Sequence, residues 1–177
     1  MIAGKLKLRS LLPEDEATFR KAVAEFKNEM PPFEFAFDFN ESIPFIEYVR
    51  KIDGWAVGKE LPDNFVPNTF LVGVVDRQIV GRISIRHCLN DYLEKIGGHL
   101  GYGVIPSCRK QGYATEMLRA AFPICLSLGI SKVLITCDVN NKGSRRVIEK
   151  CGGTFENITN DSRLEVQKRR YWIDIRS

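Results

Sequence analysis

The sequence lacks any apolar run long enough to cross a membrane. A membrane-spanning helix takes about 20 consecutive apolar residues, and no run among these 177 residues approaches that length. The N-terminal segment, residues 1–7, alternates polar and apolar residues as a strand does and shows no signal-peptide pattern. We therefore expect a cytoplasmic protein with no membrane partner.

The sequence also lacks the cysteine and histidine patterns that disulfide frameworks and zinc sites require. The five cysteines are an odd number, no two of them have C-x-x-C spacing, and there are only two histidines. This pattern is typical of reduced thiols and excludes both a disulfide framework and a zinc site. Cys108 lies beside a basic turn, but a covalent intermediate on its thiol would need a base close by, so we interpret Cys108 as an ordinary turn residue.

The chain also has only a small excess of positive over negative charge. The formal net charge is only +4, which is too small to indicate a nucleic-acid partner, and no nucleic-acid-binding motif is present. The basic residues 168–170 form a late patch that we interpret as a solvated face. The other local cluster surrounds two turns that are described below, and it consists of Arg109, Lys110, Lys142, Arg145 and Arg146.

Length and composition are those of one ordinary folded domain, which we place at residues 1–177. The apolar share of 44% and the charged share of 27% suit a globular protein with a single core. Periodicity and turn residues predict strands over 5–9, 69–75, 79–87, 100–105, 132–138, 154–158 and 170–175, with helices over 17–30, 43–52, 113–128 and a segment ending at 151. Residues 76–78 read as a hairpin turn and 90–98 as a loop.

The most informative stretch joins the strand over 100–105 to the helix over 113–128. Pro106 closes the strand because it cannot donate to a ladder, and a short basic turn from Arg109 to Gly112 follows. The first N–H groups of a helix are free and its dipole places positive charge at that end. Strand, glycine turn and helix start together predict a site for a phosphate or pyrophosphate.

This site resembles a known signature. The residues Arg109-x-x-Gly112-x-Ala114, preceded by Val104-x-Pro106, resemble the acetyl-CoA motif of the GNAT family of N-acetyltransferases. They match neither the Walker loop nor the dinucleotide fingerprint. A second element, an apolar strand over 132–138 followed by Asn-x-x-Ser, a short helix and glycines, resembles the next part of the same family.

The resemblance implies a fold and a cofactor. The fold is α/β (mixed α+β), an acyl-CoA N-acyltransferase fold whose mixed, mostly antiparallel central sheet has about seven strands and about four helices. Acetyl-CoA is then the cosubstrate, and no metal is expected. The residues implied to hold it are Val104, Ile105, Arg109, Lys110, Gln111, Gly112, Tyr113, Ala114, Thr115, Asn141 and Ser144. An N–H of Val104 or Ile105 would face the thioester carbonyl, and Asn141 and Ser144 the pantetheine and phosphate side.

The resemblance also implies an activity, namely transfer of acetyl from acetyl-CoA to a primary amine by direct attack in a ternary complex. We expect a small-molecule acceptor because the chain has no further domain to hold a macromolecule. The alternatives are a protein acetyltransferase acting on N-termini or lysines, and a non-catalytic CoA-binding sensor or interaction module. The sequence leaves a homodimer open.

The catalytic residues are not assigned by the sequence. Many family members carry a tyrosine seven residues after the position of Asn141, where it protonates the leaving thiolate, but Ile148 stands there. Tyr102 and His99 are weak substitutes for acid or base. Tyr113, Tyr171, His87 and Asp138 are weaker still.

Residues 31–41 are the candidate acceptor wall. Four phenylalanines recur at every second position from Phe33 to Phe39, with the acids Glu34, Asp38 and Glu41 among them. Apolar walls with carboxylates would suit a cationic amine. The alternative is a surface flap that covers the core with its phenylalanines and leaves its acids in solvent.

Overall fold

The computed structural model describes residues 4–27, 29–30, 33–161 and 165–176. One mixed sheet runs through it in the order β1-β2-β3-β4-β5-β7-β6. Among the described strands β4 and β5 are the only parallel neighbours. The predicted fold class is confirmed. The elements are β1 (Lys7–Ser10), α1 (Glu16–Phe26), α2 (Phe45–Ala56), β2 (Asn68–Val75), β3 (Gln78–Arg86), β4 (Leu100–Val104), α3 (Tyr113–Ser127), β5 (Lys132–Asp138), α4 (Lys142–Lys150), β6 (Thr154–Asp161) and β7 (Val166–Asp174).

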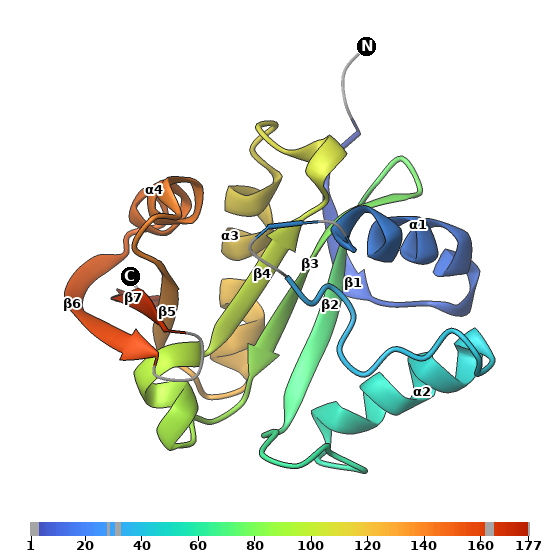
Figure 1. Cartoon of the computed structure of the whole chain (residues 1–177), viewed down its shortest axis with the longest axis horizontal. Helices are drawn as coiled ribbons and strands as arrows, with labels where there is room; N and C mark the ends of the chain where they lie inside the picture. The colour runs from blue at the N-terminus through green and yellow to red at the C-terminus, as the bar shows by residue number, and fades with distance from the viewer. Residues whose placement is uncertain (1–3, 28, 31–32, 162–164, 177) are drawn as a thin grey trace.

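The helices cover the sheet from both sides. Helices α1 and α2 lie on one face of the first strands, and α3 and α4 pack on the opposite side (Figure 1). Each side has its own apolar core. The first core gathers aromatic side chains of α1 and α2 around Phe19, Tyr48 and Trp55. The second is mainly aliphatic and joins α3 and α4 to the opposite face of the sheet, from β2 to β5 and β7.

The hairpin between β2 and β3 forms as predicted, with a shorter turn. Asp76 and Arg77 both have positive φ, 46° and 65°, and Gln78 already belongs to β3. Two successive residues with positive φ are characteristic of the tight two-residue turns that match the twist of paired strands. The turn therefore sets the register of the hairpin.

Two predicted helices have different ends. The helix predicted over 17–30 stops at Phe26, which is 5% exposed, because later residues such as Met30, at 84% exposed, bury nothing that would extend it. The helix predicted over 43–52 starts after Pro44 and continues to Ala56. The continuation buries Trp55 completely, and this burial outweighs the cost of the glycine before it.

Three other segments differ from the prediction, one loop that contains a helical turn and two strands that are longer than predicted. The loop over 90–98 contains one π-helical turn, Leu93–Gly97, which buries Leu93 and Ile96. The strands predicted over 154–158 and 170–175 extend to Asp161 and start from Val166, because β7 pairs with both β5 and β6 along its charged half. The basic side chains there form ion pairs, such as Arg170 Nη1 to Glu156 Oε2 at 2.7 Å.

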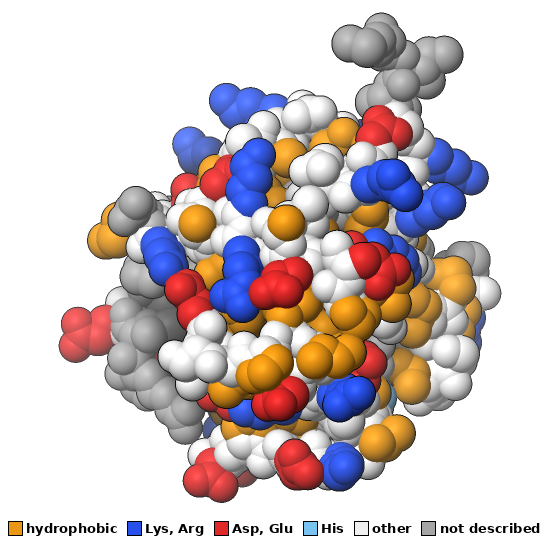
Figure 2. Space-filling model, turned by 90° about the vertical axis from the view of Figure 1, so that its right-hand side faces the viewer, with side chains coloured by type: hydrophobic (Ala, Val, Ile, Leu, Met, Phe, Trp, Pro, Cys, Tyr) orange, Lys and Arg blue, Asp and Glu red, His pale blue; other side chains and the backbone are white. Residues whose placement is uncertain are grey.

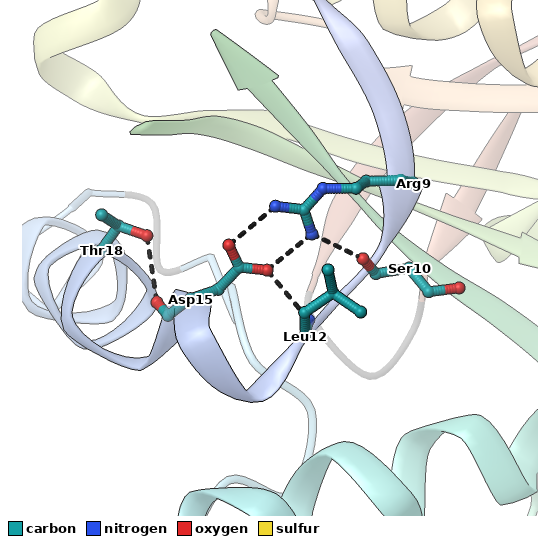
Figure 3. A network of polar contacts seen from close by, with 5 residues as sticks. All are labelled: Arg9, Ser10, Leu12, Asp15 and Thr18. Carbon is teal, nitrogen blue, oxygen red and sulfur yellow. Dashed lines mark hydrogen bonds and ion pairs between the residues drawn. The ribbon is translucent and has the colours of Figure 1, made fainter. Parts of the chain in front are cut away.

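A buried ion pair fixes the passage from β1 into α1. Asp15 is 5% exposed and accepts hydrogen bonds from Arg9 Nη1 at 2.6 Å, from Arg9 Nη2 at 2.8 Å and from the Leu12 N–H at 2.9 Å (Figure 3). Burial opposes ionisation of Asp15, but the hydrogen bonds and charge of Arg9 and the Leu12 N–H outweigh it and lower its pKa.

None of the helices in the described ranges combines the length and the apolar character that crossing a lipid bilayer requires.

Asp15→Asn is expected to lower the free energy of unfolding by about 2 kcal/mol, since it leaves Arg9 without its charged partner. Urea denaturation measures this. Because the folded-state pKa of Asp15 is below its unfolded value, the contribution is present above about pH 4 and is lost as pH falls further. The difference from the unmodified protein should therefore shrink in acid.

Glu16→Gln is the matched control. Its ion pair with Arg20, 2.9 Å long, is exposed on the surface of α1, so removing it should change the free energy of unfolding by less than about 0.5 kcal/mol. Equal losses in the two variants would contradict the role given to Asp15.

Candidate functional site

The site begins where β4 and β5 separate. Their register has a single pair, Leu100 with Ile135, so the rest of β4 has no strand partner on that side. On its other side β4 pairs with β3 through alternate residues, as the bond from the Ile105 N–H to the Val80 carbonyl at 2.9 Å shows. Alternation then turns the N–H of Val104 toward the gap.

Ile105 is not available as the predicted N–H donor. Its N–H is bonded to Val80, its carbonyl accepts the Cys108 N–H at 2.8 Å, and its side chain is 4% exposed in the first core. Val104 is therefore the only one of the two predicted residues whose N–H is free to donate to a thioester carbonyl.

The turn before α3 has the geometry of an anion site. Lys110 and Gly112 have positive φ, 63° and 91°, and Gly112 is the N-cap of the helix. The Gly112 carbonyl accepts the N–H groups of Thr115 and Glu116 at 3.0 and 3.2 Å. The N–H groups of Tyr113 and Ala114, in the first turn, have no acceptor inside the helix and converge on one spot.

A cleft of about 790 Å³ runs from this turn along β4 and between β4 and α4. Such a volume is in the range of sites for cofactors. Nine of the eleven predicted cofactor residues line it; Ile105 and Gln111 do not. The nine are Val104, Arg109, Lys110, Gly112, Tyr113, Ala114, Thr115, Asn141 and Ser144.

Arg109 serves the cleft mainly through its position in the turn. Its Nη2 lies 2.7 Å from Glu29 Oε2, its Nε donates to the Val104 carbonyl at 3.2 Å, and its guanidinium lies over the ring of Phe26. The side chain thus ties the end of α1 to β4. Backbone N–H groups are left as the main ligands for an anion.

Two hydroxyl groups, one from β4 and one from α4, meet in the cleft. Asn141 caps α4 by accepting the Ser144 N–H at 2.9 Å, and Ser144 Oγ is 2.7 Å from Tyr102 Oη. Burial raises the pKa of Tyr102 well above its usual value, although the Ser144 hydrogen bond opposes this. Tyr102 therefore stays protonated and can only donate or share a hydrogen bond.

The other catalytic candidates are placed elsewhere. Ile148 is completely buried in the second core. His99 is absent from the lining of the cleft within the described residues; its Nδ1 accepts the Leu134 N–H at 3.0 Å, and burial together with Arg86 lowers its pKa to about 4. His87 Nε2 is 2.8 Å from Thr69 Oγ1. Tyr113 lines the cleft, and Tyr171 is buried in the second core.

The phenylalanine segment is largely a cover for the first core. Within its described residues only Phe33 lines the cleft, and the later phenylalanines pack against α1 and α2. The acids point outward: Asp38 pairs with Lys51, and Glu41 with Lys27 at 3.0 Å. Figure 2 shows this side of the molecule, where acidic and basic side chains are interspersed. None of the three carboxylates of this segment is among the described residues that line the cleft.

Two arginines of β3 were missed by the sequence reasoning. Arg82 is 2% exposed and donates to the carbonyls of Phe35, Glu34 and Gly101. Arg86 lines the cleft. The pattern that could have indicated them is in residues 82–86, where polar and apolar residues alternate. In a strand this alternation places all the polar residues on one side of the sheet.

Comparison with known proteins identifies the family of this chain. A sequence profile described as an acetyltransferase (GNAT) domain matches residues 5–154. The chain belongs to the GNAT family. It is an acetyl-CoA-dependent acetyltransferase, as the resemblance implied. A search of curated proteins finds no matching sequence.

Solved structures share the GNAT fold at low identity. RimJ of Mycobacterium smegmatis, in complex with CoA-disulfide, has a TM-score of 0.72 and 17% identity over 96% of this chain and 82% of that one. Ribosomal-protein-S5-alanine acetyltransferase of Vibrio fischeri has 0.72 and 11%, over 100% and 98%. RimL, a ribosomal L7/L12 alpha-N-protein acetyltransferase in complex with coenzyme A, has 0.68 and 16%, over 98% and 96%.

Ala114→Asp tests the phosphate end of the cleft. A carboxylate in the first turn of α3 is compatible with the helix dipole, so the variant should fold with unchanged or higher Tm. It occupies the anion site, so the Kd for acetyl-CoA should rise by about thirtyfold or more, roughly 2 kcal/mol. Isothermal titration calorimetry measures the Kd.

Ile46→Asp adds the same charge to the first turn of α2 at a position that is 37% exposed and outside the cleft lining. It should leave the Kd unchanged. If Ala114→Asp binds acetyl-CoA as tightly as this control, the helix start is not the phosphate site.

Proposed function

We propose that this acetyltransferase acts on the α-amino group at the start of a peptide or protein chain. The observation that carries the proposal is the scarcity of bases in the cleft. Among the described residues that line it, Glu29 is the only acid, and it is paired with Arg109 at 2.7 Å. The lining contains no histidine among those residues, and burial raises the pKa of the Cys137 thiol to about 11.

This favours an amine that loses its proton easily. An α-ammonium group has a pKa near 8, whereas an alkylammonium such as lysine has one above 10. At neutral pH about a tenth of the former is already neutral, compared with less than a thousandth of the latter. The cations along the cleft favour the neutral amine further. A peptide amine can therefore attack without a dedicated base.

The named relatives support the same acceptor class. RimL and the Vibrio fischeri enzyme are named as acetyltransferases of ribosomal proteins, RimL at an α-amino group. With identities below 20% these names alone decide nothing about the substrate. Together with the scarcity of bases in the cleft they support a peptide N-terminus as the acceptor. The small-molecule amine that the sequence favoured is the second candidate.

The cleft fits acetyl-CoA, which is named as the cofactor of one structure with this fold, yncA of Salmonella typhimurium. The N–H groups at the start of α3 would hold its pyrophosphate, and Asn141 on α4 would face its pantetheine arm. When bound it supplies the thioester that the amine attacks. The Val104 N–H is directed so that it can donate to the carbonyl oxygen of that thioester.

Ser144 and Tyr102 would stabilise the departing thiolate. Their hydroxyls share a short hydrogen bond, and the pKa of Tyr102 is raised far above the value near 8.5 of a thiol. Proton transfer from Tyr102 to the thiolate would thus be uphill. The pair instead acts by hydrogen bonding, with Tyr102 orienting the Ser144 hydroxyl, and the thiolate takes its proton from solvent.

A peptide with a free α-amine and no lysine should be acetylated, with release of one thiol per acetyl transferred. The value of kcat/KM should rise with pH and level off above about pH 8, where the peptide amine is neutral. The same peptide with a blocked N-terminus and one lysine should react at least about a hundredfold more slowly at pH 7. Faster acetylation of the lysine peptide, or of a simple alkylamine, would overturn the proposal.

Ser144→Ala should lower kcat by about 10- to 100-fold, equivalent to a hydrogen bond to a charged group of about 1.5–3 kcal/mol. Its Kd for acetyl-CoA should change little. Tyr102→Phe should have a smaller effect in the same direction. Ser127→Ala is the matched control, since the Ser127 hydroxyl donates to a helix carbonyl at 2.7 Å on the surface of α3. An unchanged kcat in Ser144→Ala would remove the hydroxyl pair from the mechanism.

A further inference from the structure

An arginine with unused donors lies at the end of the cleft away from the phosphate turn. Arg86 ends β3, and its N–H donates to the His99 carbonyl at 2.8 Å, just before β4 begins. Its Nη1 donates to the carbonyls of Gly97 and Gly98 at 3.1 and 3.2 Å. Its Nε and Nη2 have no hydrogen-bond acceptor within the described part of the chain.

The guanidinium of Arg86 reaches the surface of β4 because residue 101 is glycine. A Cβ at Gly101 would lie only 3.2 Å from Arg86 Nη2 and 3.3 Å from Nη1. The side chain is half-buried, and burial lowers its pKa to about 10, still far above neutrality. Arg86 is therefore a partly desolvated cation at the floor of the cleft.

Three other cations near the cleft are already neutralised or fully bonded, and Lys110 lies in the phosphate turn at the other end of the cleft. Arg109 is paired with Glu29, and Lys168 with Asp138. Arg82, on the same face of β3, uses its donors on three carbonyls and the Ser84 hydroxyl, with two phenylalanine rings against its plane. No carboxylate of the described residues pairs with Arg86. A partly buried cation without a counter-ion favours an anionic ligand.

The spacing along β4 indicates which part of an acceptor would reach Arg86. Gly101 precedes Val104, the donor assigned to the thioester, by three residues. Three residues of strand span about 10 Å. The amine and carboxylate of a free amino acid are much closer together than that. In an extended peptide, with about 3.5 Å per residue, a side chain of the second or third residue lies at the required distance from the α-amine.

We propose that Arg86 binds the side-chain carboxylate of an aspartate or glutamate at the second or third position of the acceptor peptide. The inference rests on the proposed function, since it places the peptide amine at Val104. Two N–H donors of a guanidinium match the two oxygens of a carboxylate. The ion pair holds the start of the peptide along β4, with its amine directed to the thioester.

The experiment compares alanine-based peptides with a free α-amine that carry aspartate or asparagine at the second or the third position. Initial rates are measured at saturating acetyl-CoA, with free glutamate as a further acceptor. The better aspartate peptide should show kcat/KM about tenfold above its asparagine partner, with the ratio falling as salt is added. Free glutamate should be a poor acceptor.

Three variants refine the test. Arg86→Gln should bring the ratio of kcat/KM for the aspartate peptide to kcat/KM for the asparagine peptide close to one. Arg86→Glu should instead prefer a peptide with lysine at the same position over the aspartate peptide. Arg50→Gln, an exposed arginine of α2 outside the cleft lining, should keep the ratio of the unmodified protein. Tm and the Kd for acetyl-CoA show that each variant is folded and binds its cofactor.

The outcomes separate the two proposals. Equal rates for aspartate and asparagine peptides in the unmodified protein would overturn the role of Arg86 and leave the peptide acceptor standing. A ratio that survives in Arg86→Gln would assign the selectivity to another group. Acetylation of free glutamate faster than of any peptide would overturn the peptide geometry. If no α-amino peptide is acetylated, the proposed function itself fails.

Discussion

The divergence of β4 from β5 is the constraint on which the site depends. A sheet normally satisfies its backbone groups by continuous pairing, but here two neighbouring strands share one register pair, Leu100 with Ile135. The break leaves the Val104 N–H facing open space and lets a ligand lie between the strands. The hydroxyls of Tyr102 and Ser144 face the same space from its two sides. The groups of the candidate site are thus exposed to the cleft because the backbone pairing is interrupted.

Local chemistry made the geometry of the turn before α3 predictable from the sequence. A strand closed by Pro106, a basic turn and Gly112 before an amphipathic helix determine an anion site through backbone groups alone, so the choice of side chains matters little. The side to which β4 turns each N–H was not predictable, because it depends on the register with β3. This is why Val104 and Ile105 looked equivalent in the sequence, although only one of them faces the cleft.

The surroundings of the phenylalanine segment could not be predicted from the sequence because they depend on contacts between distant segments. The acids among the phenylalanines suggested a site for a cationic amine, yet they pair with Lys27 and Lys51 on the outside. The charges that face inward are arginines of β3, far away in sequence. From sequence alone, an arginine in a strand is expected to be exposed. Arg82 is instead covered by the phenylalanine segment, whose rings Phe33 and Phe37 lie against its guanidinium.

The two cores lie on opposite faces of the interrupted sheet. One core binds α1 and α2 to one face of the first strands, and the other, on the opposite face, joins α3 and α4 to strands on both sides of the interruption. Where β4 and β5 diverge, the two parts of the sheet share one register pair and the second core, and a molecule lying in the cleft adds contacts to both parts. By mass action a ligand at a hundred times its Kd adds about 2.7 kcal/mol to the free energy of unfolding. The amount of folded enzyme would then follow the supply of its cosubstrate.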